Sequence, residues 1–109
     1  MNMIECFNIL STIRARTSQA SFHVVAAEHV RIEFRNLNAG DTVGPFTYGG
    51  DVIVTCYRGE AELTADADAV HLTEYDQAVV PHGKLTSIAC QSSATVQIIW
   101  SPAHAATTI

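Results

Sequence analysis

Residues 30–35 read Val-Arg-Ile-Glu-Phe-Arg, a strict alternation of apolar and charged side chains. Successive side chains of a β-strand point to opposite faces of a sheet, so Val30, Ile32 and Phe34 share one face. A turn follows at residues 38–41, Asn-Ala-Gly-Asp, where small polar residues end the alternation. The stretch therefore predicts a β-strand that ends in a tight turn.

The same succession of short apolar segments and turns continues towards the C-terminus. Apolar or β-branched segments occupy residues 52–57, 60–64, 70–73, 78–81, 85–90 and 95–100. The stretch 43–50 carries three glycines and Pro45, and we expect a bent path there. About eight short strands with almost no helix predict an all-β fold, either a closed barrel or a two-sheet jelly roll.

The first twenty residues follow a different pattern. Ile4, Phe7, Leu10 and Ile13 recur every three positions and predict an apolar stripe on a short helix, with a strand as the alternative. We therefore divide the chain into an N-terminal segment at 1–20, a β-barrel at 21–102 and a tail at 103–109. The tail is small and polar, and we expect it to be frayed.

Composition and charge exclude several classes of partner. The net charge of the 109 residues is -5, and the six basic residues are scattered, so we expect no nucleic-acid partner. No apolar run approaches the roughly 20 residues that cross a bilayer, and we expect no membrane partner. Three distant cysteines without a Cys-x-x-Cys pair argue against a disulfide scaffold and indicate a reducing, cytoplasmic location.

The turns and glycines between residues 38 and 90 resemble those of the cupin family. The first cupin motif runs from a glycine through two histidines and a glutamate to a second glycine, and Gly40 and Gly59 stand at its two ends. The second motif contains Pro-x-Gly, which residues 81–83 supply as Pro-His-Gly. The resemblance implies a small double-stranded β-helix, or jelly-roll barrel, with a short N-terminal helix or extra strand.

The positions that bind the metal in cupins carry other residues here. Phe46 and Tyr48 stand where the family has its two motif-one histidines, Val52 replaces the glutamate, and Thr86 replaces the last histidine. Phenylalanine, valine and threonine are not useful ligands for iron, manganese, zinc or nickel, and a lone tyrosine does not make a site. The sequence therefore predicts no metal and no other cofactor, and argues against metal-dependent dioxygenase or isomerase chemistry.

Strand alternation within the cupin frame predicts which side chains face the barrel interior. The candidate ligand-binding residues are Phe46, Tyr48, Val52, Val54, Cys56, Thr86, Ile88 and Cys90, with His82 added from the loop at the barrel mouth. Such an apolar lining with a few polar groups is typical of a small-molecule pocket, in which Tyr48 and Thr86 orient the ligand. Alternatively, the same side chains simply fill a small barrel.

Three functions remain open from the sequence. The first is a metal-independent protein that binds a small apolar ligand in the barrel cavity, with no assigned catalytic residue. The second is a metal-independent isomerase or epimerase that uses Tyr48 or His82 as acid or base. The third is a structural or sensor-type dimer module. We also expect a homodimer, because the apolar N-terminal stripe needs cover and symmetric pairing is the commonest solution.

Overall fold

The computed structural model describes residues 6–26 and 30–102, with the side chains of 23–26 excepted. Within these ranges the elements are α1 (Ile9–Ala15), β1 (Ser21–Ala26), β2 (Arg31–Leu37), β3 (Thr42–Phe46), β4 (Val52–Gly59), β5 (Ala61–Ala65), β6 (Asp68–Leu72), β7 (Gln77–Val80), β8 (Thr86–Ala89) and β9 (Ala94–Trp100). Ile4 of the predicted apolar stripe, His29 and the predicted tail at 103–109 lie outside the described residues.

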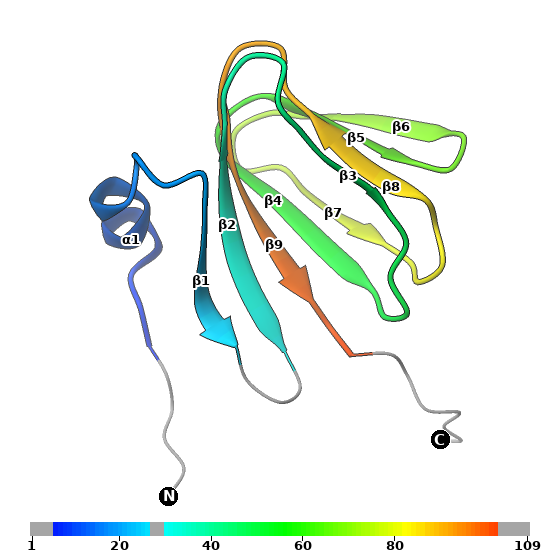
Figure 1. The fold of residues 1–109 in the computed structure, drawn as a ribbon, viewed down its shortest axis with the longest axis horizontal. Helices are drawn as coiled ribbons and strands as arrows, with labels where there is room; N and C mark the ends of the chain where they lie inside the picture. The colour runs from blue at the N-terminus through cyan, green and yellow to red at the C-terminus, as the bar shows by residue number, and fades with distance from the viewer. Residues whose placement is uncertain (1–5, 27–29, 103–109) are drawn as a thin grey trace, which may run out of the picture.

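The strands form two antiparallel sheets that face each other (Figure 1). The five-stranded sheet has the order β1-β2-β9-β4-β7, and the four-stranded sheet has the order β3-β8-β5-β6. Sequential neighbours such as β4 and β5 lie in different sheets, which is the arrangement of a jelly roll. The predicted all-β, jelly-roll fold is confirmed. No helix in the described ranges has the length and hydropathy needed to cross a bilayer.

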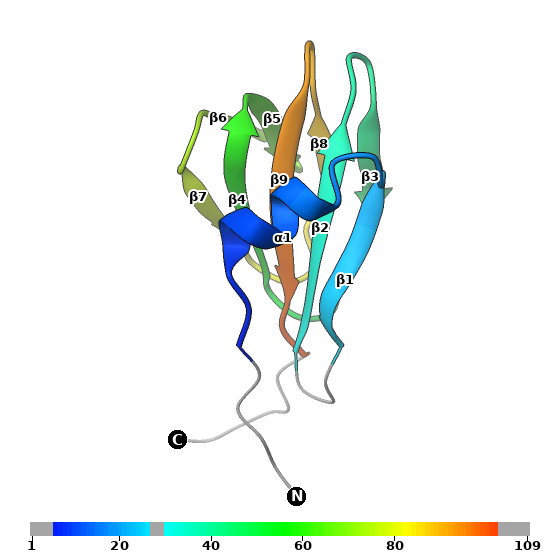
Figure 2. The ribbon, with the colours of Figure 1, turned by 90° about the vertical axis from the view of Figure 1, so that its left-hand side faces the viewer.

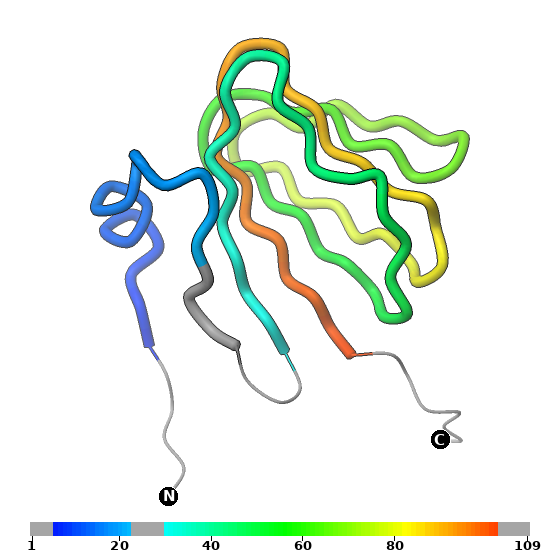
Figure 3. Tube along the Cα trace, viewed as in Figure 1, coloured from blue at the N-terminus to red at the C-terminus, as the bar shows by residue number. Residues whose placement is uncertain are grey.

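The turns that the sequence predicts close the barrel at its corners. Figure 3 shows the β2–β3 turn beside the turn between β8 and β9, and the amide of Gly40 donates to the carbonyl of Cys90 at 2.9 Å. Gly40 has a φ of 85° and Gly59 a φ of 76°, a backbone conformation that favours glycine. A side chain at Gly59 would also collide with the carbonyl oxygen of Ser93. The backbone conformation therefore explains why glycine stands at both positions of the cupin frame.

The main hydrophobic core lies between the two sheets. It contains buried residues of both sheets, and the fully buried ones include Val54, Cys56, Ile88, Val96 and Ile98. In each strand these side chains alternate with outward-facing ones, as the period of two requires. The interior of the barrel is therefore lined by the aliphatic and thiol side chains that the sequence predicted.

A second, smaller core lies on the outer face of the five-stranded sheet. It contains Phe22 and Phe34, whose rings are stacked with centroids 5.2 Å apart, and Ile13 of α1. Figure 2 shows α1 lying across this face. Ile32 and Phe34 share a face, as the alternation predicted, and that face is the outer one, because α1 covers it. The charged face of β2 is consequently turned towards the barrel.

The short helix is confirmed, but its apolar stripe is only partly as predicted. The Oδ1 of Asn8 accepts from the amide of Ser11 at 2.9 Å and caps the helix. Ile9 and Ile13, four residues apart, face the sheet, whereas Leu10 is 47% exposed. A spacing of three drifts away from the 3.6-residue period, so the predicted inclusion of Leu10 was wrong.

Candidate functional site

Three of the four positions that bind metal in the cupin frame lie next to Trp100, and the fourth, Thr86, is the strand partner of Phe46. Phe46 pairs with Thr86 between β3 and β8, and Val52 pairs with Trp100 between β4 and β9. The rings of Phe46 and Tyr48 each lie with their centroid 5.0 Å from that of Trp100. The geometry thus brings the predicted positions together, at the end of the barrel where β4 begins and β9 ends.

A buried carboxylate holds the indole in place. Nε1 of Trp100 donates to Oε1 of Glu33 at 2.6 Å, and Glu33 is only 3% exposed. Nε of Arg35 donates to the other carboxylate oxygen at 2.8 Å. The guanidinium carbon of Arg31 lies 4.7 Å from the Trp100 ring centroid, within the range of a cation–π contact. We call Arg31, Glu33, Phe46, Tyr48 and Trp100 the Trp100 cluster.

Sequence reasoning missed Trp100, Glu33 and Arg31 as members of this site. The alternation in β2 placed Arg31, Glu33 and Arg35 on one face, but it did not indicate that this face is turned towards the barrel interior. The one signal available was that Trp100 is the only tryptophan of the chain and ends the last apolar segment. Arg31 and Arg35 lie 3.9 and 2.8 Å from the Glu33 carboxylate, and Asp51 adds a second carboxylate at this end, beside the loop that carries His82.

The metal-ligand positions do not form a donor set for a transition metal. Thr86 is 1% exposed, and its hydroxyl donates to the carbonyl of Lys84 at 3.0 Å. Phe46 and Val52 have no donor atoms in their side chains, so Tyr48 and Thr86 are the only oxygen-bearing groups among the four. Across the described ranges, no group of three or more His, Cys, Asp or Glu side chains is placed to hold a metal ion.

The deeper candidate residues are packed into the main core. Val54, Cys56 and Ile88 are 0% exposed, and Cys90 and Val52 are also buried. Interiors of small barrels are commonly filled by side chains in this way. Phe46 and Tyr48 pack against the same core but remain partly exposed. These two rings are therefore the partly exposed members of the candidate set at this end of the barrel.

His82 is not brought together with the other candidates. Its side chain is 66% exposed, and Nδ1 lies 3.7 Å from Oδ1 of Asp51. The same Asp51 oxygen accepts from the amide of His82 at 3.1 Å, and the amide of Gly83 donates to the carbonyl of Tyr48 at 2.9 Å. These bonds fix the loop beside Tyr48 while the imidazole stays at the surface.

The buried thiol of Cys56 is held in its neutral form. Its Sγ donates to the carbonyls of Arg58 and Gly59 at 3.5 and 3.4 Å. Desolvation raises the pKa of Cys56, although the hydrogen bond to Arg58 partly opposes the shift. Because the thiolate is the nucleophile, this environment fits the predicted core role better than a catalytic one. Cys6, Cys56 and Cys90 are all free.

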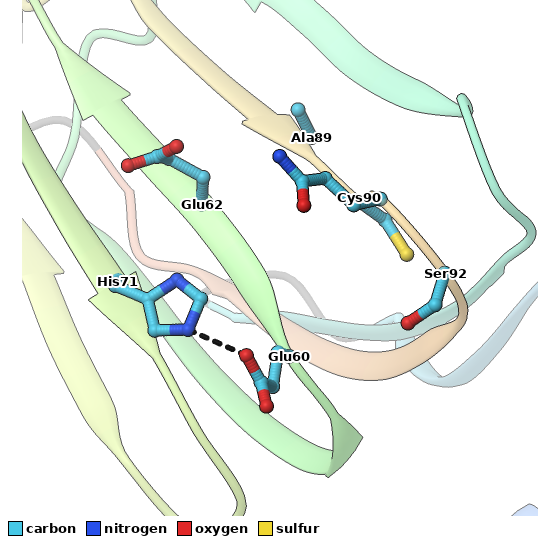
Figure 4. A pocket seen from close by; sticks show the side chains of 7 residues that line it. Glu60, Glu62, His71, Ala89, Cys90 and Ser92 are labelled. Atoms are coloured by element: carbon cyan, nitrogen blue, oxygen red, sulfur yellow. Dashed lines mark hydrogen bonds and ion pairs between the residues drawn. The ribbon is translucent and has the colours of Figure 1, made fainter.

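A hollow of about 470 Å³ lies away from the Trp100 cluster, on the four-stranded sheet (Figure 4). Its walls are Glu60, Glu62, His71, Ala89, Cys90, Gln91 and Ser92. Nε2 of His71 and Oε1 of Glu60 are joined at 2.7 Å. Of the residues predicted for the ligand site, only Cys90 takes part in it. The side chain of His71 is 56% exposed, and sequence reasoning did not bring these neighbours together.

No family model matches the sequence, and neither does any curated protein. Solved structures do match. A conserved protein of unknown function from Streptococcus pyogenes has a TM-score of 0.78 at 22% identity, with 95% of each chain covered. A cupin superfamily protein from Desulfitobacterium hafniense has a TM-score of 0.77 at 25% identity, with 94% of each chain covered.

An enzyme is also among the similar structures. Salicylate 1,2-dioxygenase from Pseudoaminobacter salicylatoxidans has a TM-score of 0.74 at 18% identity, over 85% of this chain and 33% of the enzyme. At 18% identity the structural similarity establishes only the fold, because proteins with one fold can carry out many different reactions. The predicted resemblance is therefore confirmed at the level of architecture.

Proposed function

The chain has the cupin fold, and from that premise we propose that it binds a small organic molecule without a metal ion, at the end of the barrel formed by the Trp100 cluster. The observation that supports the proposal is that Phe46, Tyr48 and Val52, at three of the four ligand positions, lie next to one indole ring. Phe46 and Tyr48 flank Trp100 at 5.0 Å and remain partly exposed. Apolar contacts with a few polar groups are the usual composition of a ligand site.

The polar groups at this end favour a particular orientation of the ligand. The side chain of Arg31 is 45% exposed and extends over Trp100, so it can meet a polar or anionic group of a molecule that stacks on the rings. Glu33 is already bonded to Trp100 and Arg35, and its role is to hold them in position. The ligand class that fits is a small, largely apolar molecule with one acceptor group.

Trp100 is itself the probe for this proposal, because the chain has no other tryptophan. We expect aromatic acids such as benzoate, added as a series of increasing ring size, to change Trp100 fluorescence saturably and to raise the melting temperature. Tyr48→Leu should weaken the response, whereas Tyr75→Leu, at a position 65% exposed and away from the cluster, should not. A complete screen in which neither fluorescence nor melting responds would refute the proposal.

A structural module is the second candidate. The observation that favours it is the complete burial of Val54, Cys56 and Ile88, which leaves the deep interior to side chains. Under this function the Trp100 cluster only closes the barrel. The same screen separates the two candidates, since a purely structural barrel binds none of the compounds and keeps its melting temperature.

A further inference from the structure

The hollow on the four-stranded sheet has the size of a small-molecule site. Its volume of about 470 Å³ falls within the range of ligand pockets, which is roughly 300 to 1,000 Å³. It lies on the outer side of the sheet, because Glu62 and His71 are exposed while their chain neighbours Leu63 and Leu72 are buried. The hollow therefore opens on the outer side of the sheet, and Cys90 is the one lining residue that also belongs to the main core.

The side chains of the hollow have a definite arrangement. Glu62 and His71 are direct register partners on β5 and β6, and Glu62 is paired on its other side with Ala89 of β8. Glu60 is joined to His71, so the imidazole lies among two carboxylates (Figure 4). Ala89 and the buried Cys90 supply apolar surface between the glutamates and the turn that follows β8.

The charge of the hollow selects the chemical class of its ligand. Its walls carry two carboxylates, and His71 is the only basic side chain among them. Gln91 and Ser92 add neutral hydrogen-bonding groups on the opposite side. The described residues provide no group of three metal-binding side chains here, so the acidic walls do not make a metal site. A cation that also has a carbon chain fits both the carboxylates and the apolar surface.

We propose that this hollow binds a small aliphatic amine, with an ammonium group held by Glu62 and Glu60 and its carbon chain against Ala89 and Cys90. An ammonium group donates three hydrogen bonds and suits carboxylate acceptors. The site is separate from the Trp100 cluster, because none of its lining residues belongs to that cluster. The inference does not rest on the function proposed above.

The test is a calorimetric titration with 1,4-diaminobutane, with 1,4-butanediol as the uncharged control of equal length. We expect one saturable site for the diamine and none for the diol. In amide NMR spectra the diamine should shift Ala89, Gln91 and Ser92, while the fluorescence of Trp100 stays unchanged. Shifts spread over all acidic surfaces without saturation would overturn the proposal, because they would report only attraction to a chain of net charge -5.

Paired variants assign the binding to the hollow. Glu62→Gln and Glu60→Gln keep the size of the side chain, and each should weaken diamine binding about threefold, with the double variant near tenfold, as exposed charge pairs do. Glu74→Gln removes an exposed carboxylate outside the hollow and should leave the affinity unchanged. Equal binding by the wild type and the double variant would overturn the proposal.

Discussion

Trp100 and Glu33 are joined by a 2.6 Å hydrogen bond although 67 residues separate them in the chain. The bond ties the end of β9 to the middle of β2 on the side of the sheet that faces the barrel. A buried carboxylate that accepts from an indole N–H and from Arg35 has both of its oxygens occupied. The pair therefore fixes the indole beside the rings of Phe46 and Tyr48.

Replacing Glu33 by leucine should lower the free energy of unfolding by about 1.5–3 kcal/mol, because hydrogen bonds to a charged group are lost and the Trp100 N–H is left without its acceptor. Glu33→Gln keeps a hydrogen-bond acceptor of similar shape, so its free energy of unfolding should fall by less than that of the leucine variant. Urea denaturation followed by circular dichroism measures both variants. A leucine variant as stable as the wild type would show that the bond does not hold the cluster.

Replacing Val54 by tryptophan tests whether the deep interior is filled. Val54 is 0% exposed, so overpacking should lower the free energy of unfolding by about 1–3 kcal/mol. The control is Val79→Trp at a position that is 62% exposed, where we expect little change. Thermal and urea denaturation provide the measurement. A Val54→Trp protein of unchanged stability would mean that the barrel has room for the indole and for a ligand of its size.

Alkaline pH should destabilise the protein through Cys56. Burial raises the pKa of this thiol in the folded chain, and unfolding restores the ordinary, lower pKa. The unfolded chain therefore loses the proton first as the pH rises, and stability falls above the ordinary thiol range. Cys56→Ala should reduce this pH dependence, measured as the slope of the unfolding free energy against pH.

Tyr57 provides the control for that experiment. Burial also raises the pKa of its phenol, so it contributes a loss of stability with the same sign at higher pH. Tyr57→Phe should remove the contribution of Tyr57 to the pH dependence of stability and leave the contribution of Cys56 unchanged. If the slope in the thiol range is the same in Cys56→Ala as in the wild type, the thiol is not responsible.

We further propose that the protein is a homodimer, as the sequence predicted for a different reason. The apolar stripe of α1 is partly covered by the chain's own β1 and β2. The outer face also carries one apolar row of register partners across four neighbouring strands, which consists of Ile32, Ile99, Ile53 and Val79. A second copy presents the same uncharged row, as a twofold interface requires. Light scattering at tens of micromolar should give twice the chain mass. Val79→Lys should shift the protein towards the monomer, and a wild-type monomer at that concentration would contradict the proposal.

Local patterns predicted the strands other than β1 and β3, and the turns at Gly40 and Gly59, because these depend on neighbouring residues. The predicted segments at 60–64 and 70–73, for example, correspond to β5 and β6. The side of β2 that meets the barrel could not be predicted, since an alternation is the same whichever face is covered. The Trp100–Glu33 bond and the hollow around Glu62 depend on strands far apart in sequence, which no local pattern joins.

The central proposal is that no metal binds at the four cupin ligand positions, because other side chains stand there. The most direct measurement is elemental analysis of the purified protein after incubation with iron, manganese, nickel and zinc, each followed by exhaustive dialysis. Phe46, Tyr48, Val52 and Thr86 do not form a ligand set, so we predict metal far below one equivalent per chain. Close to one equivalent of any of these metals, retained through dialysis and lost when Tyr48 is replaced by phenylalanine, would contradict the claim.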